Sequence, residues 1–203
     1  MIKKIIQFSL LVTTVAFINS CSKKSSNENT ETDSVAVEVV EEEEEVKVPA
    51  SPRAEATGEV SGISITIDYG SPSVKGRTIW GVKEEYGKVW RAGANETTSI
   101  NFSGDVLVGG EAVAAGKYGF FIIPNEEGDW VAILSTQWSQ EDHGIWGAMG
   151  YNEENDIVRI NIMPTWADEI QERLEYSVSD NAINFAWEKA RLSIPIEPAP
   201  AEE

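Results

Sequence analysis

A strict alternation of apolar and polar residues recurs along the chain after residue 50, and it is typical of β-strands. It is clearest where Ile63, Ile65 and Ile67 alternate with Ser64 and Thr66. Because successive side chains of a strand point to opposite faces, a period of two places the apolar residues on one face of a sheet. The same pattern returns over residues 158–162, 174–178, 183–187 and 192–196. The chain should therefore fold into paired antiparallel strands.

Turn residues separate several of these segments and predict which strands are neighbours. Residues 179–182, Ser-Asp-Asn-Ala, stand between two alternating segments, and Gly109 and Gly110 stand between two shorter apolar runs. Short polar or glycine pairs at such positions are typical of β-hairpin turns. Each turn should therefore join two adjacent antiparallel strands.

Two features predict where strands lie within a sheet. Residues 118–123 include the run Phe-Phe-Ile-Ile, which is apolar at successive positions. A strand of this kind is covered on both faces, so we expect a central strand with residues 130–134 as its partner. Pro195 cannot donate a backbone hydrogen bond, and it predicts an edge position for the last strand.

The fold class follows from these patterns. No segment of helical length shows a convincing apolar period of 3.6 residues, and the best candidate, residues 165–173, is one or two turns at most. We expect an all-β fold, either an antiparallel β-sandwich, which is preferred, or a partly closed barrel. One domain over residues 51–197 is long enough to bury its own core, with a disordered tail over residues 198–203.

Residues 1–20 have the layout of a secretory signal peptide, with Lys3 and Lys4 before an apolar stretch too short for a stable membrane span. Residues 18–21, Ile-Asn-Ser-Cys, resemble the lipobox of bacterial lipoproteins, in which the cysteine receives a diacylglycerol. Cys21 is the only cysteine of the chain, so it cannot form an internal disulfide. We expect a lipid on Cys21 to anchor an outer-membrane lipoprotein, on the periplasmic side or at the cell surface. The alternative is an ordinary cleaved signal.

The composition of the chain predicts the character of the segment before the domain and the kind of partner that the domain can bind. Residues 21–50 are rich in Ser, Asn, Thr and Glu, carry five consecutive glutamates at 41–45, and lack an apolar period. Such a segment buries too little apolar surface to offset its ordering entropy, so we expect a disordered acidic tether. The net charge of −18 falls mostly after residue 50 and disfavours nucleic acid as a partner.

Two irregular segments, residues 70–77 and 87–96, concentrate positive charge in this acidic domain, and loops on a sheet scaffold often carry binding sites. We therefore predict a site for an anionic or carboxylate-bearing ligand. Its candidate residues are Lys75, Arg77, Trp90, Arg91, Asn95 and Glu96. The alternative is structural: Arg77 and Arg91 would form internal ion pairs with acids such as Asp68 or Glu96.

Besides Trp90, the other six of the seven tryptophans fall into two groups. Trp130 and Trp187 lie in strand patterns and are expected in the core. The others singled out stand in or beside irregular stretches: Trp80, Trp138, Trp146 and Trp166. Each of these four could stack on a sugar ring or simply be buried, and the sequence leaves the choice open.

Enzymatic chemistry has little support in the sequence. His143, the only histidine, lies beside Glu141 and Asp142, but zinc normally takes three or four protein ligands, so we predict neither metal nor cofactor. No catalytic motif is present. The remaining enzymatic alternative is a hydrolase of envelope or polysaccharide substrates that uses carboxylates such as Glu96 and Asp142 as acid and base.

Several stretches resemble the domain of unknown function 2911, a bacterial family common in Bacteroidetes. They are Ser51-Pro52-Arg53 and residues 65–69, 71–77, 87–98 and 115–118, of which Lys-Val-Trp-Arg-Ala-Gly-Ala-Asn-Glu at 88–96 is the most specific. The resemblance implies an exported, mainly β domain and brings no known ligand or reaction. Our leading hypothesis is therefore a non-catalytic envelope module that binds an anionic glycan, a peptide or a protein partner.

Overall fold

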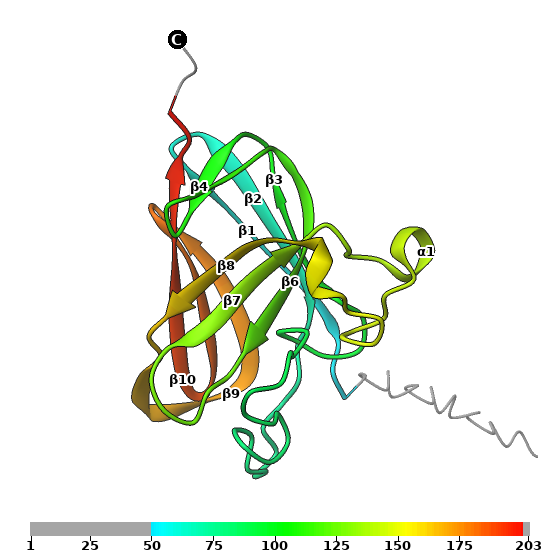
Figure 1. Cartoon of the computed structure of the whole chain (residues 1–203). Coiled ribbons are helices and arrows are strands. Elements are labelled where there is room, and N and C mark those ends of the chain that lie inside the picture. The colour runs from blue at the N-terminus through cyan, green and yellow to red at the C-terminus, as the bar shows by residue number, and fades with distance from the viewer. Residues whose placement is uncertain (1–49, 201–203) are drawn as a thin grey trace, which may run out of the picture. The chain divides into compact units, whose positions relative to one another are not determined.

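A computed structural model describes residues 50–200 of the chain (Figure 1). The expected signal peptide over residues 1–20, the lipidation site Cys21, the tether up to residue 49 and the last three residues lie outside the described part. Within residues 50–200, no helix is long and apolar enough to cross a membrane. The helical turns in this part are α1 (Gln140–His143) and η1 (Glu153–Asn155).

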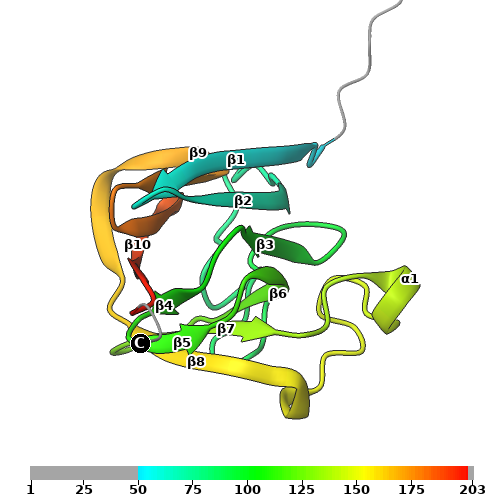
Figure 2. The ribbon, with the colours of Figure 1, turned by 90° about the horizontal axis from the view of Figure 1, so that it is seen from above.

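The strands form two antiparallel sheets. The larger sheet has the order β1 (Arg53–Val60), β2 (Ile63–Gly70), β3 (Thr98–Phe102), β6 (Gly116–Ile123), β7 (Trp130–Ser135) and β8 (Asp156–Ile162). The smaller sheet has the order β5 (Glu111–Val113), β4 (Val106–Val108), β10 (Ala182–Pro198) and β9 (Thr165–Ser179). Figure 2 shows the larger sheet curving from β1 to β8 with the smaller sheet facing its concave side. The sheets do not close into a barrel, which confirms the predicted β-sandwich.

The main core lies between the two sheets and is built by the alternating segments. Ile65 and Ile67 of β2, and Phe185 and Trp187 of β10, are at most 1% exposed. Burying a side chain of this size contributes about 1.5–3 kcal/mol, so these positions account for much of the stability. The period of two therefore predicted the core-facing positions correctly.

Both predicted hairpins are present. Ser179 at the end of β9 pairs with Ala182 at the start of β10, and Val108 of β4 pairs with Glu111 of β5. Gly109 and Gly110 between the latter strands have φ angles of 59° and 92°, a region that favours glycine.

The apolar run in β6 is explained by a second, smaller core. Phe120 faces the main core, while Phe121 packs with Ile133 and Ile145 on the opposite face of the sheet. The segment that follows β7, residues 136–155, covers this outer cluster. β6 lies between β3 and β7 with Phe120 opposite Leu134, so the predictions of a central strand and of its partner are confirmed.

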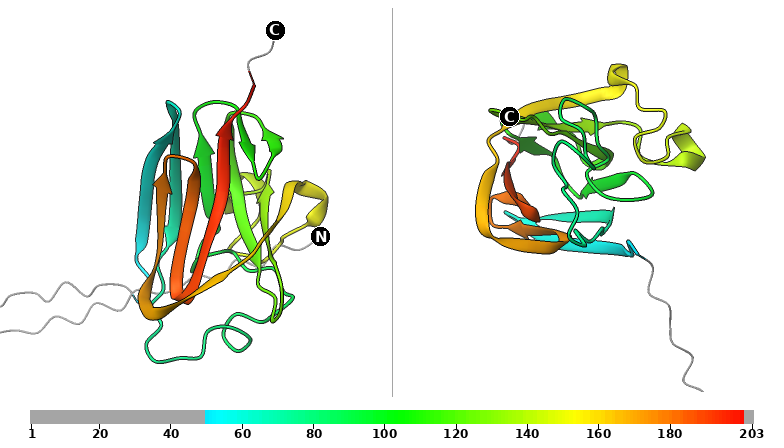
Figure 3. Two further views of the ribbon diagram at one scale, coloured as in Figure 1. Left: turned by 90° about the vertical axis from the view of Figure 1, so that its left-hand side faces the viewer. Right: turned by 90° about the horizontal axis from the view of Figure 1, so that it is seen from below.

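The prediction that Pro195 marks an edge strand is wrong, because β10 lies between β4 and β9. The backbone N–H of Ile196 donates to the carbonyl of Asn181 (2.9 Å), so the end of β10 lies beside its beginning, and Figure 3 shows the strand turning back. Pairing with β4 starts only at Ile196. Pro195 is tolerated because it lies just before the first residue of this ladder, and its carbonyl, which proline retains, accepts the N–H of Gly109 (2.9 Å).

The short helix considered for residues 165–173 is also wrong, because these residues form the first half of β9. They pair with β10 through an irregular ladder that places Trp166 opposite Ala190 and shifts register at Glu188. Trp166 and Ile170 are 52% and 55% exposed, so this half of the strand is held mainly by its backbone partner rather than by a buried face. Side-chain periodicity carries little information about such a strand.

Residues 71–97, between β2 and β3, contain no named strand, and we call them the closing segment. Figure 1 shows this segment at one end of the sandwich. Trp80 and Trp90 lie in the main core with Trp130 and Trp187, with ring centroids of Trp90 and Trp187 5.5 Å apart. Trp130 and Trp187 are core residues, as predicted, and for Trp80 the structure decides in favour of burial.

Candidate functional site

The outer side of the closing segment carries a cavity of about 190 Å³, which we call the cationic pocket. Its charged lining residues are Arg77, Lys83, Glu84 and Arg91, and Asn95 completes the polar wall. The pocket therefore collects three cations and one acid in a domain that is otherwise strongly acidic. Arg77, Arg91 and Asn95 are three of the six residues predicted from the sequence.

Arg77 is positioned by its own turn. Its Nε donates to the carbonyl of Val74 (3.0 Å), and Nη2 donates to the carbonyl of Ser73. Lys75 and Gly76 in this turn have φ angles of 50° and 66°. Lys75 is exposed and does not line the pocket. Its backbone N–H donates to Glu172 Oε1 (3.0 Å).

Arg91 is held differently, by packing. An added Cβ at Gly147 would lie 2.9 Å from Arg91 Cδ and 3.1 Å from Nη1, so the Arg91 side chain lies directly against this glycine. Arg91 Nε is buried and has no hydrogen-bond acceptor among residues 50–200. A buried donor without a partner costs about 1–3 kcal/mol, and such groups in native proteins have a functional or solvent explanation.

The predicted internal ion pairs do not involve these two arginines. Asp68 Oδ2 lies 2.8 Å from Arg53 Nη2, and Glu96 Oε2 lies 3.6 Å from Arg53 Nη1. Within residues 50–200, neither Arg77 nor Arg91 has a carboxylate within 4.0 Å. Asp68 and Glu96, the acids expected to pair with Arg77 and Arg91 if those arginines were structural, therefore pair with Arg53 instead.

Glu84 is the acid of the cationic pocket. Burial raises its pKa, while the ammonium of Lys83 at 3.4 Å and, more weakly, the guanidinium groups of Arg91 and Arg77 oppose the rise. Only 13% of the Glu84 side chain is exposed. Proton uptake by Glu84 would leave the pocket with positive charge alone, which favours an anion.

Trp90 and Glu96, the remaining predicted residues, do not line the cationic pocket. Trp90 is buried, donates from Nε1 to the carbonyl of Gly93 (3.1 Å) and stacks on Trp187, so its indole belongs to the core. Glu96 lies on the other side of the chain from Asn95 and lines a different pocket. Asn95 itself, at φ 63°, donates from Nδ2 to the carbonyl of Ser51 (3.2 Å).

This second pocket, of about 270 Å³, lies on the outer face of the larger sheet, and we call it the tryptophan pocket. It is lined by Arg53, Asp68, Glu96, Lys117, Trp138 and Trp146 together with smaller and polar residues. Asp142 does not line it, and the Asp142 carboxylate instead accepts from Ser139 Oγ (2.9 Å). Glu96 and Asp142, the acid and base of the hydrolase alternative, therefore do not share a pocket.

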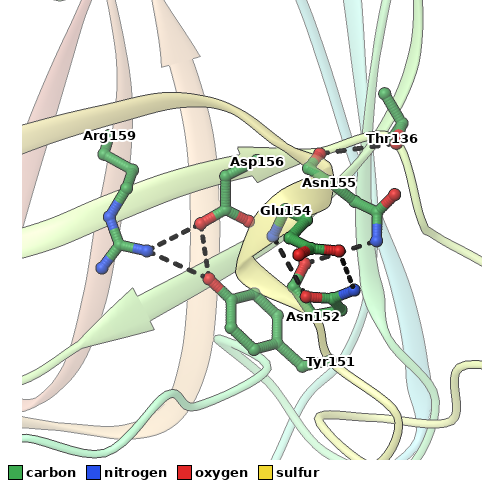
Figure 4. Close-up of polar contacts among 7 residues, drawn as sticks. All are labelled: Thr136, Tyr151, Asn152, Glu154, Asn155, Asp156 and Arg159. Atoms are coloured by element: carbon green, nitrogen blue, oxygen red, sulfur yellow. Dashed lines mark hydrogen bonds and ion pairs between the residues drawn. The ribbon is translucent and has the colours of Figure 1, made fainter.

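The segment after β7 is fixed to the larger sheet by a polar cluster shown in Figure 4. Tyr151 Oη donates to Asp156 Oδ2 (2.5 Å), and Arg159 Nη1 donates to the same oxygen (2.7 Å). Burial, and then the Asp156 carboxylate, raise the pKa of Tyr151, so the phenol stays protonated and keeps this bond at neutral pH. The cluster holds Tyr151 over Phe121, with ring centroids 5.1 Å apart.

Sequence reasoning missed Lys83, Glu84, Arg53 and Lys117. Lys83 and Glu84 follow the buried pair Ile79 and Trp80, and only the tertiary position of the closing segment shows that they meet the arginines. His143 and its acidic neighbours do not form a metal-binding group, and no cluster of three metal-binding side chains occurs within residues 50–200.

Comparison with known families settles membership. Residues 51–196 match the family described as protein of unknown function (DUF2911). The chain belongs to this family. Neither the curated proteins nor the solved structures gave a match. Because DUF2911 carries no assigned activity, the function of this member has to be argued from its pockets.

Proposed function

We propose that this DUF2911 domain is a non-catalytic binding module and that its cationic pocket holds a carboxylate or similar anionic group of its ligand. The observation that carries the proposal is that Arg77 and Arg91 line one pocket together with Lys83, and that neither arginine has a carboxylate within 4.0 Å among residues 50–200. A carboxylate bound in the pocket would give these guanidinium groups the charged partner that they lack. Guanidinium groups suit this role because they present several donors in a fixed plane.

The size of the pocket supports recognition of an end group. A water molecule occupies about 30 Å³ in the liquid, so a cavity of about 190 Å³ holds a group of roughly six water volumes. That suits a uronic acid carboxylate with part of its ring, or the carboxyl terminus of a peptide. The rest of an anionic glycan, peptide or protein partner would lie outside the pocket.

The test is a thermal-shift titration of the purified full-length protein with glucuronate, an alanyl dipeptide and acetate. A ligand at 100 times its dissociation constant stabilises the fold by about 2.7 kcal/mol, which is a readable shift. We expect Arg91→Met to abolish the shift while leaving the unliganded melting temperature within a few degrees. Lys75→Met is the matched control, because it removes an exposed cation of the same segment that does not line the pocket. A shift that survives Arg91→Met, or that both variants lose equally, would refute the site.

We also propose that the chain is an outer-membrane lipoprotein anchored through Cys21, which would place this module in the cell envelope. The support is the signal-like segment over residues 1–20 and the single cysteine at its end. Cells grown with a labelled fatty acid should incorporate label into the wild-type protein and not into Cys21→Ser. The double variant Cys21→Ser/Ser22→Cys keeps a thiol one residue further on and should also remain unlabelled. Label in Cys21→Ser would contradict the proposal, because it would show that the lipid is attached to another residue.

A further inference from the structure

The tryptophan pocket has an aromatic rim with one free indole. Trp138 is already occupied, because Lys117 Nζ lies 4.3 Å from its ring centroid and the His143 ring lies 5.4 Å away. Trp146 is 38% exposed and, among residues 50–200, stacks on no other aromatic ring and lies under no cation. An exposed indole on the wall of a pocket offers a flat apolar face to a ligand.

The backbone holds Trp146 at this position firmly. Its N–H donates to the carbonyl of Met149 (3.1 Å), and the N–H of Met149 donates back to Trp146 (3.0 Å). Gly147 has a φ of 63°, and its carbonyl accepts from the buried Thr97 Oγ1 (2.9 Å). The turn that carries the ring is therefore tied to the strand side of the pocket.

The polar wall opposite is balanced in charge. Arg53 and Lys117 bring two cations, and Asp68 and Glu96 bring two carboxylates. Arg53 bridges both acids, at 2.8 Å to Asp68 and 3.6 Å to Glu96, which fixes the planes of these groups while leaving acceptor and donor positions free. Such a wall has no net charge to attract an ion, but it can both donate to and accept from hydroxyl groups.

We propose that the tryptophan pocket binds a neutral pyranose ring of a glycan, stacked on Trp146, with its hydroxyls hydrogen-bonded to Glu96, Asp68 and Arg53. A sugar ring has an apolar face of C–H groups and a rim of hydroxyls that donate and accept, which matches one free indole facing paired charges. None of the residues of this pocket lines the cationic pocket, so the two sites can be tested with separate substitutions.

The experiment is isothermal titration of the purified full-length protein with four neutral oligosaccharides: maltohexaose, cellohexaose, chitohexaose and mannohexaose. We expect at least one to bind, and Trp146→Leu to weaken that binding by about tenfold or more. Trp146→Phe keeps a ring that can stack and should retain part of the affinity, which separates stacking from mere bulk.

Trp166→Ala is the matched control, because Trp166 is 52% exposed but belongs to β9 and lies outside this pocket. The Trp166→Ala protein should bind the sugar with the affinity of the wild type. Circular dichroism confirms that each variant is folded before its titration is interpreted. The proposal fails if none of the four sugars binds at millimolar concentration, if Trp146→Leu binds as tightly as Trp146→Phe, or if Trp166→Ala weakens binding as much as Trp146→Leu does.

Discussion

At the scale of single residues, Glu84 gives the cationic pocket a pH dependence. Burial raises its pKa above the ordinary value of 4.5, so the folded protein holds the proton more tightly than the unfolded chain. The contribution of Glu84 to stability is therefore fully present below the unfolded pKa and is lost as the pH rises through the folded one, because the carboxylate must then be charged while buried. In the same window the pocket loses positive charge, so an anionic ligand should bind more weakly as the pH rises.

Glu84→Gln should remove this dependence. We expect the wild type to bind trifluoroacetate, which stays ionised throughout, severalfold more tightly at about pH 5 than at about pH 7. The variant, which resembles the protonated acid, should bind equally at both and at least as tightly as the wild type at the lower pH. Glu85→Gln removes an exposed neighbouring charge and should keep the wild-type slope. Titration by isothermal calorimetry measures this, and a slope that persists in Glu84→Gln would mean that another group controls the pocket.

At the scale of elements, the sequence predicted those strands whose side chains decide their position. The period of two appears in β2, in β9 after residue 173 and in β10, because one face of each strand is buried. The run in β6 is apolar on both faces because Phe121 packs in the second, smaller core. The first half of β9 was not recognised as a strand, and the place of Pro195 was predicted wrongly. In both, backbone pairing between residues distant in sequence decides the structure, and no local pattern records such pairing.

The site was predictable to a similar degree and for a similar reason. The concentration of arginines in the closing segment was visible in the sequence, and Arg77, Arg91 and Asn95 do line one pocket. Trp90, which is next to Arg91, lies in the core because neighbouring residues of an extended segment point in opposite directions. The contribution of Glu84 depends on a fold of the closing segment that contains no regular strand, so periodicity could not have revealed it.

At the scale of the whole molecule, both pockets depend on the same packed end of the sandwich. Ser51 lines the cationic pocket and Arg53 lines the tryptophan pocket, so both lie close to where the described chain begins. Trp80 and Trp90 of the closing segment pack on Trp187 of the smaller sheet, with centroid distances of 5.6 and 5.5 Å. The binding surface should therefore unfold together with the two sheets rather than as an independent loop.

Trp187→Ala tests this coupling, because it removes a fully buried ring that joins the smaller sheet to the closing segment. Truncation of a buried tryptophan costs about 3–5 kcal/mol of unfolding free energy, and here it should also weaken carboxylate binding in the cationic pocket, which Trp187 does not touch. Trp166→Ala, on the neighbouring strand, removes a half-exposed ring that meets Trp130 at 6.1 Å, so it should cost clearly less than Trp187→Ala and leave binding unchanged. Urea unfolding followed by circular dichroism measures both, and each variant should show one transition. If Trp187→Ala instead unfolds in two steps, the closing segment folds as a separate unit, and the structure of the cationic pocket does not depend on the sandwich core.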